Sequence, residues 1–424
     1  MPNRWADVRE SLDSSKHFTD LMDTPWYGDA VYDRFSEDEY ARRHRVAREL
    51  MAAEGVDALL LTGSPNIYSM GAGVTWGCGL IDDRAMCQYL LLPRDGEPTL
   101  VYPHPGCHIE AARKQVGIAD VRDGHHGRYA EVLAGRIREL GLERGVLGVT
   151  LADRTGKEYL GQHAYEVLRE ELPALTIRFL PDALHRLTRR KGEEELAAMR
   201  RAGELAIAGL EAVVERARPG VAEYQLAAAS TNAILDGGGK PFLIMIGSTS
   251  MADPMMVFPN PLPSARRLAA GDVILCEISA TYLGYSAKIG HPVSVGPPSA
   301  RYVDFYDKVV VPGFEAIRHE LRDGVSLETV QAAGAHFRSA GAQSRPILMH
   351  GIDLLTSDPM VTTDKITAAP YENVLERGQT VNVEITPIDA TGVMGIFLSR
   401  TFAITDGPPD ELTPYQLDDI LVAG

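Results

Sequence analysis

Ionisable residues interrupt four apolar stretches in the second half of the sequence. Two stretches, "VILCEISA" and "YSAKIGH", contain Glu277 and Lys288, and two others, "ILMHGID" and "TVNVEITPI", contain His350 and Glu384. Carboxylates, an imidazole and an ammonium are the groups that enzymes use for general acid and base catalysis. One such residue alone is typical of a strand's solvent face, but burying four of them requires mutual pairing. We therefore expect these side chains to converge on one cleft.

The segment 276–296 is predicted to form two strands joined by a tight turn that contains glycine. It places Lys288 opposite Glu277. An unpaired charge inside a sheet is costly or becomes neutral, so a buried lysine requires a carboxylate partner or a functional role. The hairpin alone does not decide between these alternatives.

The elements that must position these residues follow from local patterns. Residues 36–54 have a capping Ser36, acidic residues in the first turn and apolar residues at helical spacing, and 55–63 follow as a buried strand. Residues 84–102 are typical of a hairpin closed by Asp95-Gly96. The first 180 or so residues are therefore predicted to be a mixed α/β domain, and the peak of charge density near 189 marks the domain boundary.

The second half of the sequence contains a weak internal repeat. Residues 217–229 and 321–333 share a helix, a glycine-containing turn and a second helix, and each is followed by apolar strand material. Two such halves suggest a duplicated domain with a pseudo-twofold axis and a site on the sheet between the halves. Chance similarity is the alternative.

Composition limits the classes of partner. The chain has 424 residues, of which 45% are hydrophobic and 24% charged, as is usual for globular proteins. The net charge of −16 argues against nucleic acid or an anionic membrane as a partner, because both would be repelled. Four scattered cysteines indicate a reducing compartment, and the lack of an apolar segment long enough to span a membrane favours a cytoplasmic protein.

An ordered series of motifs resembles the creatinase, prolidase and methionine aminopeptidase family. The matching pieces are "KGEEELAAMRRAGELA", "RPGVAEYQLAAA", "RRLAAGDVILCEISATYLGY", "LMHGI", "RGQTVNVEI", "FLSRTFAITDGPPDELT" and, in the first half, "NIYSMGAG" and "LLLPRDGEPTLV". The resemblance implies an α/β (α+β) protein with a creatinase-like N-terminal domain at 1–188 and a duplicated "pita-bread" domain at 189–424. It also implies a homodimer, as is common among creatinases and prolidases.

The resemblance also implies where metal ligands would lie. The family's metallopeptidases hold two divalent metals with Asp, Asp, His, Glu and Glu, in that order. The corresponding residues in this chain are Glu277, Lys288, His350, Glu384 and Ser399. Two ligands are thus lost, and one has become a cation that would repel a divalent ion. We expect no bound metal and no cofactor, with Lys288 between Glu277 and Glu384.

The remaining groups suggest catalysis by side chains alone. His350 is the candidate general acid or base, because its ordinary pKa lies near neutrality. Glu277 and Glu384 are candidates to orient a cationic substrate or act as bases, and Glu384 also as a nucleophile. Lys288 is the candidate to stabilise a developing oxyanion. The alternatives are a histidine left over from the metal site, carboxylates that only pair with Lys288, and a lysine that only fills the metal position.

Several further residues are assigned to substrate binding. An acid at Asp353, where the family has glycine, hints at an altered specificity pocket, and Phe258 lies in a Met-rich and aromatic stretch suited to an apolar wall. Arg84 could bind a carboxylate from the first domain or from a dimer partner. The complete set is Asp353, His291, Tyr285, Ser399, Phe258 and Arg84.

These inferences lead to three functional hypotheses. The first is a metal-independent enzyme that hydrolyses a small molecule, or eliminates from it, at a C–N or related bond. The second is a metal-dependent Xaa-Pro aminopeptidase, and the third is a non-catalytic binding module with the same fold. Only the enzyme hypotheses require groups that titrate in the cleft.

Overall fold

The computed structural model describes residues 29–63, 71–81, 88–103, 107–124, 128–151, 159–354 and 356–423. The chain divides into two compact units, Met1–Leu187 and Thr188–Gly424. Both units combine helices with a sheet, so the predicted mixed α/β class is confirmed. Within the described ranges, no helix is both long and apolar enough to cross a membrane.

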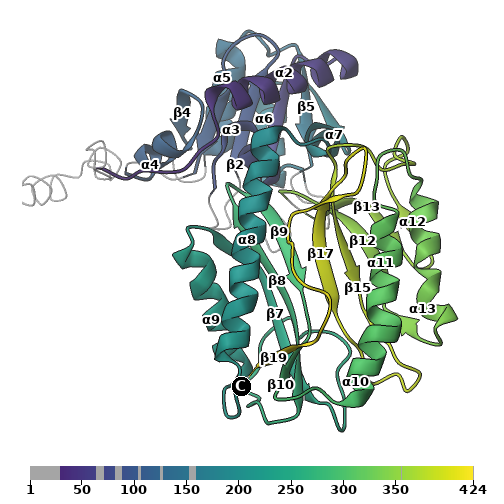
Figure 1. The fold of residues 1–424 in the computed structure, drawn as a ribbon. Coiled ribbons are helices and arrows are strands. Elements are labelled where there is room, and N and C mark those ends of the chain that lie inside the picture. Colours follow the sequence, from purple (N-terminus) through teal and green to yellow (C-terminus); the bar gives the residue numbers. More distant parts are fainter. Residues whose placement is uncertain are drawn as a thin grey trace, which may run out of the picture. The chain divides into compact units, whose positions relative to one another are not determined.

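The first unit is built on a six-stranded mixed sheet with the order β4-β3-β2-β1-β5-β6 (Figure 1). Its elements are α2 (Glu37–Glu54), β1 (Ala58–Gly63), α3 (Ala72–Cys78), β2 (Gln88–Pro93), β3 (Thr99–Tyr102), α4 (Cys107–Gln115), β4 (Asp120–Asp123), α5 (Tyr129–Glu139), β5 (Val146–Thr150), α6 (Gln162–Glu171), β6 (Thr176–Leu180) and α7 (Ala183–Thr188).

Local sequence signals account for the start of this unit. The Ser36 hydroxyl accepts a hydrogen bond from the backbone N–H of Glu39, which satisfies one of the free donors at the start of α2. Gly55 ends the helix in the left-handed conformation at φ 62. The strands β2 and β3 pair antiparallel across a turn in which Gly96 has φ 116, so the predicted hairpin is present.

The second unit contains an eleven-stranded sheet with the order β14-β13-β12-β15-β17-β9-β8-β10-β19, in which β7 also pairs with β8 and β18 with β17. Its helices are α8 (Glu193–Arg216), α9 (Glu223–Asp236), α10 (Ala300–Phe305), the π-helix η2 (Tyr306–Val310), α11 (Val311–His319), α12 (Leu327–Ala333) and α13 (Ala335–Ser339). Its strands are β7 (Lys240–Ser250), β8 (Asp272–Tyr282), β9 (Tyr285–Gly290), β10 (Val293–Val295), β11 (Gln343–Ser344), β12 (Ile347–Ile352), β13 (Thr356–Thr362), β14 (Ile366–Thr367), β15 (Thr380–Ile385), β16 (Pro387–Ile388), β17 (Leu398–Ala403), β18 (Asp410–Glu411) and β19 (Leu421–Ala423). The short strands β11 and β16 form a separate pair.

Two apolar cores lie on this large sheet. One joins α8 and α9 to β8 and β9, through residues such as Leu210, Leu226 and Ile278. The other joins α11 and α12 to β12 and β15, through residues such as Phe314 and Val383. Figure 1 shows α8 and α9 alongside β7 and β8, and α11 and α12 alongside β12 and β15. The order helix, helix, strand occurs in both halves, in agreement with the repeat predicted from the sequence.

The predicted hairpin at 276–296 is formed by β8 and β9. Their antiparallel register pairs Tyr282 with Tyr285, and the two-residue turn between them has φ 49 at Leu283 and φ 84 at Gly284. Positive φ at both turn positions matches the twist of paired strands. The same register pairs Ser279 with Lys288 and Glu277 with Gly290, so the prediction that Lys288 lies directly opposite Glu277 is wrong by two residues. The two side chains still meet, because they lie on the same face of neighbouring strands.

Candidate active site

Side chains from four strands meet at the Lys288 ammonium. Its Nζ lies 2.7 Å from Oε1 of Glu277 on β8 and 2.7 Å from Oε2 of Glu384 on β15. It also lies 3.2 Å from Nε2 of His350 on β12. The structure thus brings together all four residues to which the sequence analysis assigns catalysis, with Lys288 between the two carboxylates. We call these four residues the Lys288 cluster.

The hydrogen bonds of the Lys288 cluster fix the tautomer of His350. Its Nδ1 lies 2.8 Å from the carbonyl oxygen of Gly351, which can only accept a hydrogen bond, so Nδ1 carries the proton. The unprotonated Nε2 then accepts from Lys288. An ammonium has three N–H donors, and here they face three acceptors, on Glu277, Glu384 and His350. In this arrangement neither ring nitrogen of His350 is free to move a substrate proton.

Burial and neighbouring charges shift the pKa values of Lys288 and Glu384 in opposite directions. Burial alone would lower the pKa of Lys288, but the carboxylates of Glu277 and Glu384 outweigh it and raise that pKa above its ordinary value. Burial alone would raise the pKa of Glu384, but the Lys288 ammonium holds that pKa well below its usual range. This pair therefore stays ionised at neutral pH.

Glu277 behaves differently from Glu384. Burial raises the pKa of Glu277 to about 7, because desolvation and the nearby charge of Glu384 together outweigh the attraction of Lys288. Burial also lowers the pKa of His350, and the positive charge of Lys288 lowers it further. Of the four groups, Glu277 is thus the one that changes its charge near neutral pH, which is the property required of a general acid or base.

A layer of uncharged polar residues lies beside the Lys288 cluster. Ser399 is the cross-strand partner of Glu384, and its hydroxyl exchanges hydrogen bonds of 3.0 and 3.1 Å with the Asn382 amide. Thr401 donates to the backbone carbonyl of Lys288 and accepts from its N–H, at 3.0 and 2.9 Å. Ser399 therefore stands next to the cluster, but its hydroxyl is hydrogen-bonded to the Asn382 amide and not to a residue of the cluster.

The donor set does not fit the pair of divalent metals that the resemblance implies. An ammonium lies 2.7 Å from both carboxylates, at the point where a cation would have to bind. Lys288 and Ser399 stand at two of the five ligand positions, and a protonated amine offers no lone pair. Among the residues that the structure describes, no group of three or more His, Cys, Asp or Glu side chains is arranged to hold a metal ion.

Three residues assigned to substrate binding form contacts with other residues of the protein, and their role in substrate binding stays a prediction. Tyr285 donates from its hydroxyl to Glu195, and Asp353 forms a buried ion pair with Lys191 at 2.9 Å. Nδ1 of His291 lies 2.8 Å from a guanidinium nitrogen of Arg400. It is three residues beyond Lys288, and strand alternation directs it to the opposite face of the sheet. There, burial and the adjacent guanidinium lower its pKa to about 3.

Phe258 contacts Phe397, and the Phe397 ring lies against Gly290, the cross-strand neighbour of Glu277. Its ring packs edge-on against Phe397 at 5.2 Å between centroids. Phe397 in turn covers Gly290, where an added Cβ would lie 2.2 Å from the Phe397 ring, so the close approach requires glycine. Gly290 is the cross-strand partner of both Glu277 and Ser399. Arg84, the last of the predicted set, lies outside the described residues.

Arg345 is a residue that the sequence analysis missed. Its guanidinium carbon lies 3.7 Å from the centroid of the Phe258 ring, its side chain is exposed, and its charge lowers the pKa of Glu277. Nothing in the local sequence marks it, because it precedes a strand and neighbours no other charged residue. Only the packing of the sheet brings it close to Glu277.

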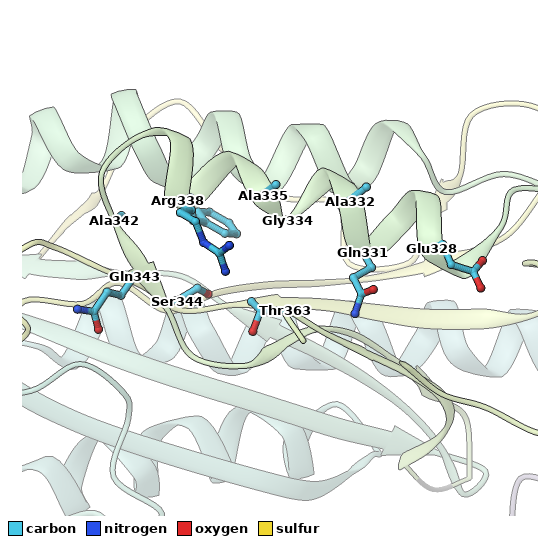
Figure 2. Close-up of a pocket in the computed structure, with 11 residues that line it drawn as sticks. Glu328, Gln331, Ala332, Gly334, Ala335, Arg338, Ala342, Gln343, Ser344 and Thr363 are labelled. Atoms are coloured by element: carbon cyan, nitrogen blue, oxygen red, sulfur yellow. The ribbon is translucent and has the colours of Figure 1, made fainter. Parts of the chain in front are cut away.

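A separate cavity of about 470 Å³ lies beside α12 and α13. Figure 2 shows Arg338 and Gln331 among its lining residues, together with Gln343, Ser344 and Thr363. None of the Lys288 cluster lines this cavity. It is therefore a different feature from the candidate active site.

Comparisons with known proteins agree with this fold. A model of the family described as "Metallopeptidase family M24" matches residues 197–406. A probable dipeptidase PepE of Mycobacterium tuberculosis is 29% identical over 321 residues, which cover 71% of this chain and 75% of that protein. A Xaa-Pro dipeptidase of Pyrococcus horikoshii is 21% identical over 373 residues, which cover 87% of this chain and 95% of that protein. The crystal structure of an X-Pro aminopeptidase from Thermotoga maritima has a TM-score of 0.74 at 18% identity and covers 89% of this chain and 99% of that one. The predicted fold is confirmed.

Replacing Lys288 by methionine should destabilise the protein by about 3–5 kcal/mol at pH 7, because two buried carboxylates lose their counter-charge. This loss of stability should become smaller as the pH falls, since protonation neutralises the two buried carboxylates. Chemical unfolding at pH 7 and pH 5 measures this. The control Lys308→Met removes an exposed ion pair with Asp304 and should have little effect. A double variant with Glu277→Gln should recover part of the loss, whereas Lys288→Met as stable as wild type at pH 7 would contradict the account.

The pKa of Glu277 predicts a specific pH dependence of stability. Folded Glu277 keeps its proton up to about pH 7, whereas the unfolded chain releases it near the ordinary value of 4.5. Its contribution to stability is therefore complete below about pH 4.5 and is lost as the pH rises through 7. Unfolding measured from pH 5 to 8 should show this decline in wild type and not in Glu277→Gln. Glu223→Gln, which removes a buried carboxylate whose pKa is lowered, should keep the decline. Equal slopes in wild type and Glu277→Gln would refute the assignment.

Proposed function

We propose that this chain, which belongs to the metallopeptidase family M24, is a metal-independent enzyme that acts on a small molecule. The reaction that the site favours is hydrolysis or elimination at a C–N or related bond, run by side chains. The observation that carries this proposal is the ammonium of Lys288 placed between two carboxylates of a site that in the family holds metal.

The two carboxylates support a division of labour. Their pKa values are pushed apart, with Glu277 near neutrality and Glu384 permanently ionised. Such a separation is typical of sites in which one carboxyl group moves protons and the other holds charge. Glu277 is proposed as the general base and acid. Glu384 keeps Lys288 protonated, and His350, with both ring nitrogens engaged, positions the ammonium.

In hydrolysis, ionised Glu277 takes a proton from a water molecule as the water oxygen bonds to the electrophilic carbon of the substrate. Protonated Glu277 no longer attracts Lys288 as strongly, so one ammonium N–H is released to the oxyanion that develops on the substrate. Glu277 then returns its proton to the leaving nitrogen as the C–N bond breaks. For elimination, Glu277 takes the proton from carbon instead of from water.

The surroundings of the site fit a small substrate. The four side chains of the Lys288 cluster are 2 to 7% exposed, with Lys288 and Glu384 the most accessible. Side chains as little exposed as these suit a small molecule better than a polypeptide. The homodimer, the cytoplasmic location and the domain division after residue 188 remain predictions from the sequence.

A metal-dependent Xaa-Pro peptidase is the second candidate. It is supported by the names of the relatives, among them a Xaa-Pro dipeptidase and an X-Pro aminopeptidase. It would require Lys288 to leave the centre of the cluster or to lose its proton between two carboxylates. Both carboxylates raise the pKa of that ammonium, so they oppose the loss of its proton.

Metal content distinguishes the two candidates. Wild-type protein equilibrated with Mn²⁺, Co²⁺ or Zn²⁺ and then desalted should retain no stoichiometric metal by elemental analysis. The double variant Lys288→Asp with Ser399→Glu restores two anionic ligands and should retain metal, whereas Lys308→Asp with Ser339→Glu, a change at exposed positions, should not. Stoichiometric metal in wild type would favour the peptidase.

Turnover is tested with a panel of small amides, amidines and Xaa-Pro dipeptides in the presence of a chelator. The proposal expects turnover of at least one compound, unchanged by the chelator and reduced about 100-fold or more in Lys288→Met, the range for losing an oxyanion-stabilising group. Glu277→Gln should abolish the pH dependence near 7 along with most of the activity. Turnover that requires added metal would contradict the proposal.

A further inference from the structure

We propose that the cavity beside α12 and α13 is a second ligand site of this protein. Its ligand is an elongated zwitterion, a small molecule with an anionic group at one end and a cationic group at the other. The anionic group lies at Arg338 and the cationic group at Glu328. This inference goes beyond the proposed function, because none of the Lys288 cluster lines the cavity.

One wall of the cavity is a single face of the helical segment 327–339. α12 ends at Ala333 and α13 begins at Ala335, and Gly334 between them keeps helical angles, φ −64 and ψ −13, so the two helices are nearly continuous. The side chains on this wall recur every three or four positions, as one face of a helix requires. They are Glu328, Gln331, Ala332, Ala335 and Arg338. Figure 2 shows the two alanines between the two charged residues, where short side chains leave room for a ligand.

The opposite wall comes from strand segments. Gln343 and Ser344 lie on β11, and Thr363 lies in the turn between β13 and β14. The side-chain amide of Gln331 donates to the carbonyl of Thr362 at 2.8 Å, which joins the helical wall to that turn. The hollow between the walls is therefore formed before a ligand arrives, as is usual for small-molecule sites.

The base of the cavity is tightly packed. Phe337, which lines it, is 1% exposed. A Cβ added at Gly334 would lie 2.3 Å from a methyl carbon of Leu348 on β12, so the helical segment approaches the sheet as closely as its backbone allows. The cavity thus has a closed floor and opens only to the surface.

Polar groups on both walls are available to a ligand. Figure 2 shows the Arg338 guanidinium directed toward the strand segments that carry Ser344 and Thr363. Within the part of the chain that the structure describes, this guanidinium forms no ion pair and no hydrogen bond, and neither does the Glu328 carboxylate. In the same described ranges, the Thr363 hydroxyl and the Gln343 amide also have no hydrogen-bond partner. Two opposite charges and two polar groups therefore border one cavity without being paired.

These charges specify the ligand. The guanidinium of Arg338 presents paired N–H groups that match the two oxygens of a carboxylate, and the Thr363 hydroxyl is a further donor. The Glu328 carboxylate attracts an ammonium. One exposed charge binds little alone, but two charges that meet the same ligand act together, because the second contact forms within the complex.

The separation of the charges sets the length of the ligand. Arg338 follows Glu328 by ten positions, which corresponds to about 15 Å along a helix at 1.5 Å per residue. An extended peptide spans about 3.3–3.6 Å per residue, so roughly four residues reach from one charge to the other. A single amino acid, with its ammonium and carboxylate on one carbon, is too short. The cavity volume of about 470 Å³ lies in the range of small-molecule sites.

Calorimetric titration of the full chain with tetraglycine tests this site. The comparison ligands are glycine, tetraglycine amide and N-acetyl-tetraglycine, which lack the length, the anionic end and the cationic end, respectively. Tetraglycine should bind, and each blocked form should bind about 10-fold more weakly, the range for a lost charge-assisted hydrogen bond. Glycine should not bind measurably.

Variants assign each charge to one end of the ligand. Arg338→Gln should weaken tetraglycine about 10-fold and leave its amide unchanged, whereas Glu328→Gln should weaken tetraglycine and leave the N-acetyl form unchanged. Ala335→Phe, which fills the hollow from an exposed position, should abolish the binding of all three. The matched controls are Arg218→Gln and Glu215→Gln, at exposed positions near the end of α8 and outside this cavity, and they should change nothing.

An ω-amino fatty acid of the same length separates two sources of such a ligand. If it binds as tightly as tetraglycine, the site recognises the charges alone, and if only tetraglycine binds, the site recognises a short peptide with free ends. Either result supports the site.

Several outcomes would overturn the inference. These are no binding of either compound at about 50 mM, glycine bound as tightly as tetraglycine, equal losses for tetraglycine and its amide in Arg338→Gln, or unchanged binding to Ala335→Phe. None of these measurements involves turnover, so the inference can fail while the proposed enzyme stands, and the reverse also holds.

Discussion

The second unit depends on one buried interaction, the pairing of the Lys288 ammonium with two carboxylates. A single charge removed from water inside a sheet is costly, and the attraction between opposite charges offsets that cost only when every donor and acceptor is matched. Here three N–H donors meet Glu277, Glu384 and His350. The match explains why a cation can occupy a position that in the family holds metal, and why Glu384 stays ionised in an apolar surrounding.

This interaction also joins the two halves of the unit. Glu277 and Lys288 come from β8 and β9, whose apolar side packs against α8 and α9, whereas His350 and Glu384 come from β12 and β15, which pack against α11 and α12. Each half of the unit supplies two of the four residues of the Lys288 cluster. Strand alternation then separates two tasks on one sheet. The face with the Lys288 cluster holds the candidate chemistry, and the opposite face buries His291 and Arg400 in a structural contact.

Sequence patterns predicted the elements well and marked four residues that the structure brings together, for physical reasons that are local. The cap at Ser36, the turn at Asp95-Gly96 and the interruption of apolar strands by charged residues are all visible within a few positions. The contacts of Tyr285 and Asp353 could not be predicted, because their partners Glu195 and Lys191 lie 90 and 162 residues away in the sequence. Arg345 was missed for the same reason, since its significance arises only from the stack of Phe258 and Phe397 over Gly290.

The most direct test of the account is a crystal structure of the wild-type protein grown with excess Mn²⁺ and recorded at an X-ray energy where manganese scatters anomalously. If Lys288 replaces the metal, no anomalous peak should appear between Glu277 and Glu384, and density for the Lys288 side chain should end within hydrogen-bonding distance of both. A manganese peak coordinated by these carboxylates and His350, with Lys288 turned away, would contradict it. In that case the chain would have to be regarded as a metallopeptidase with a rebuilt ligand set.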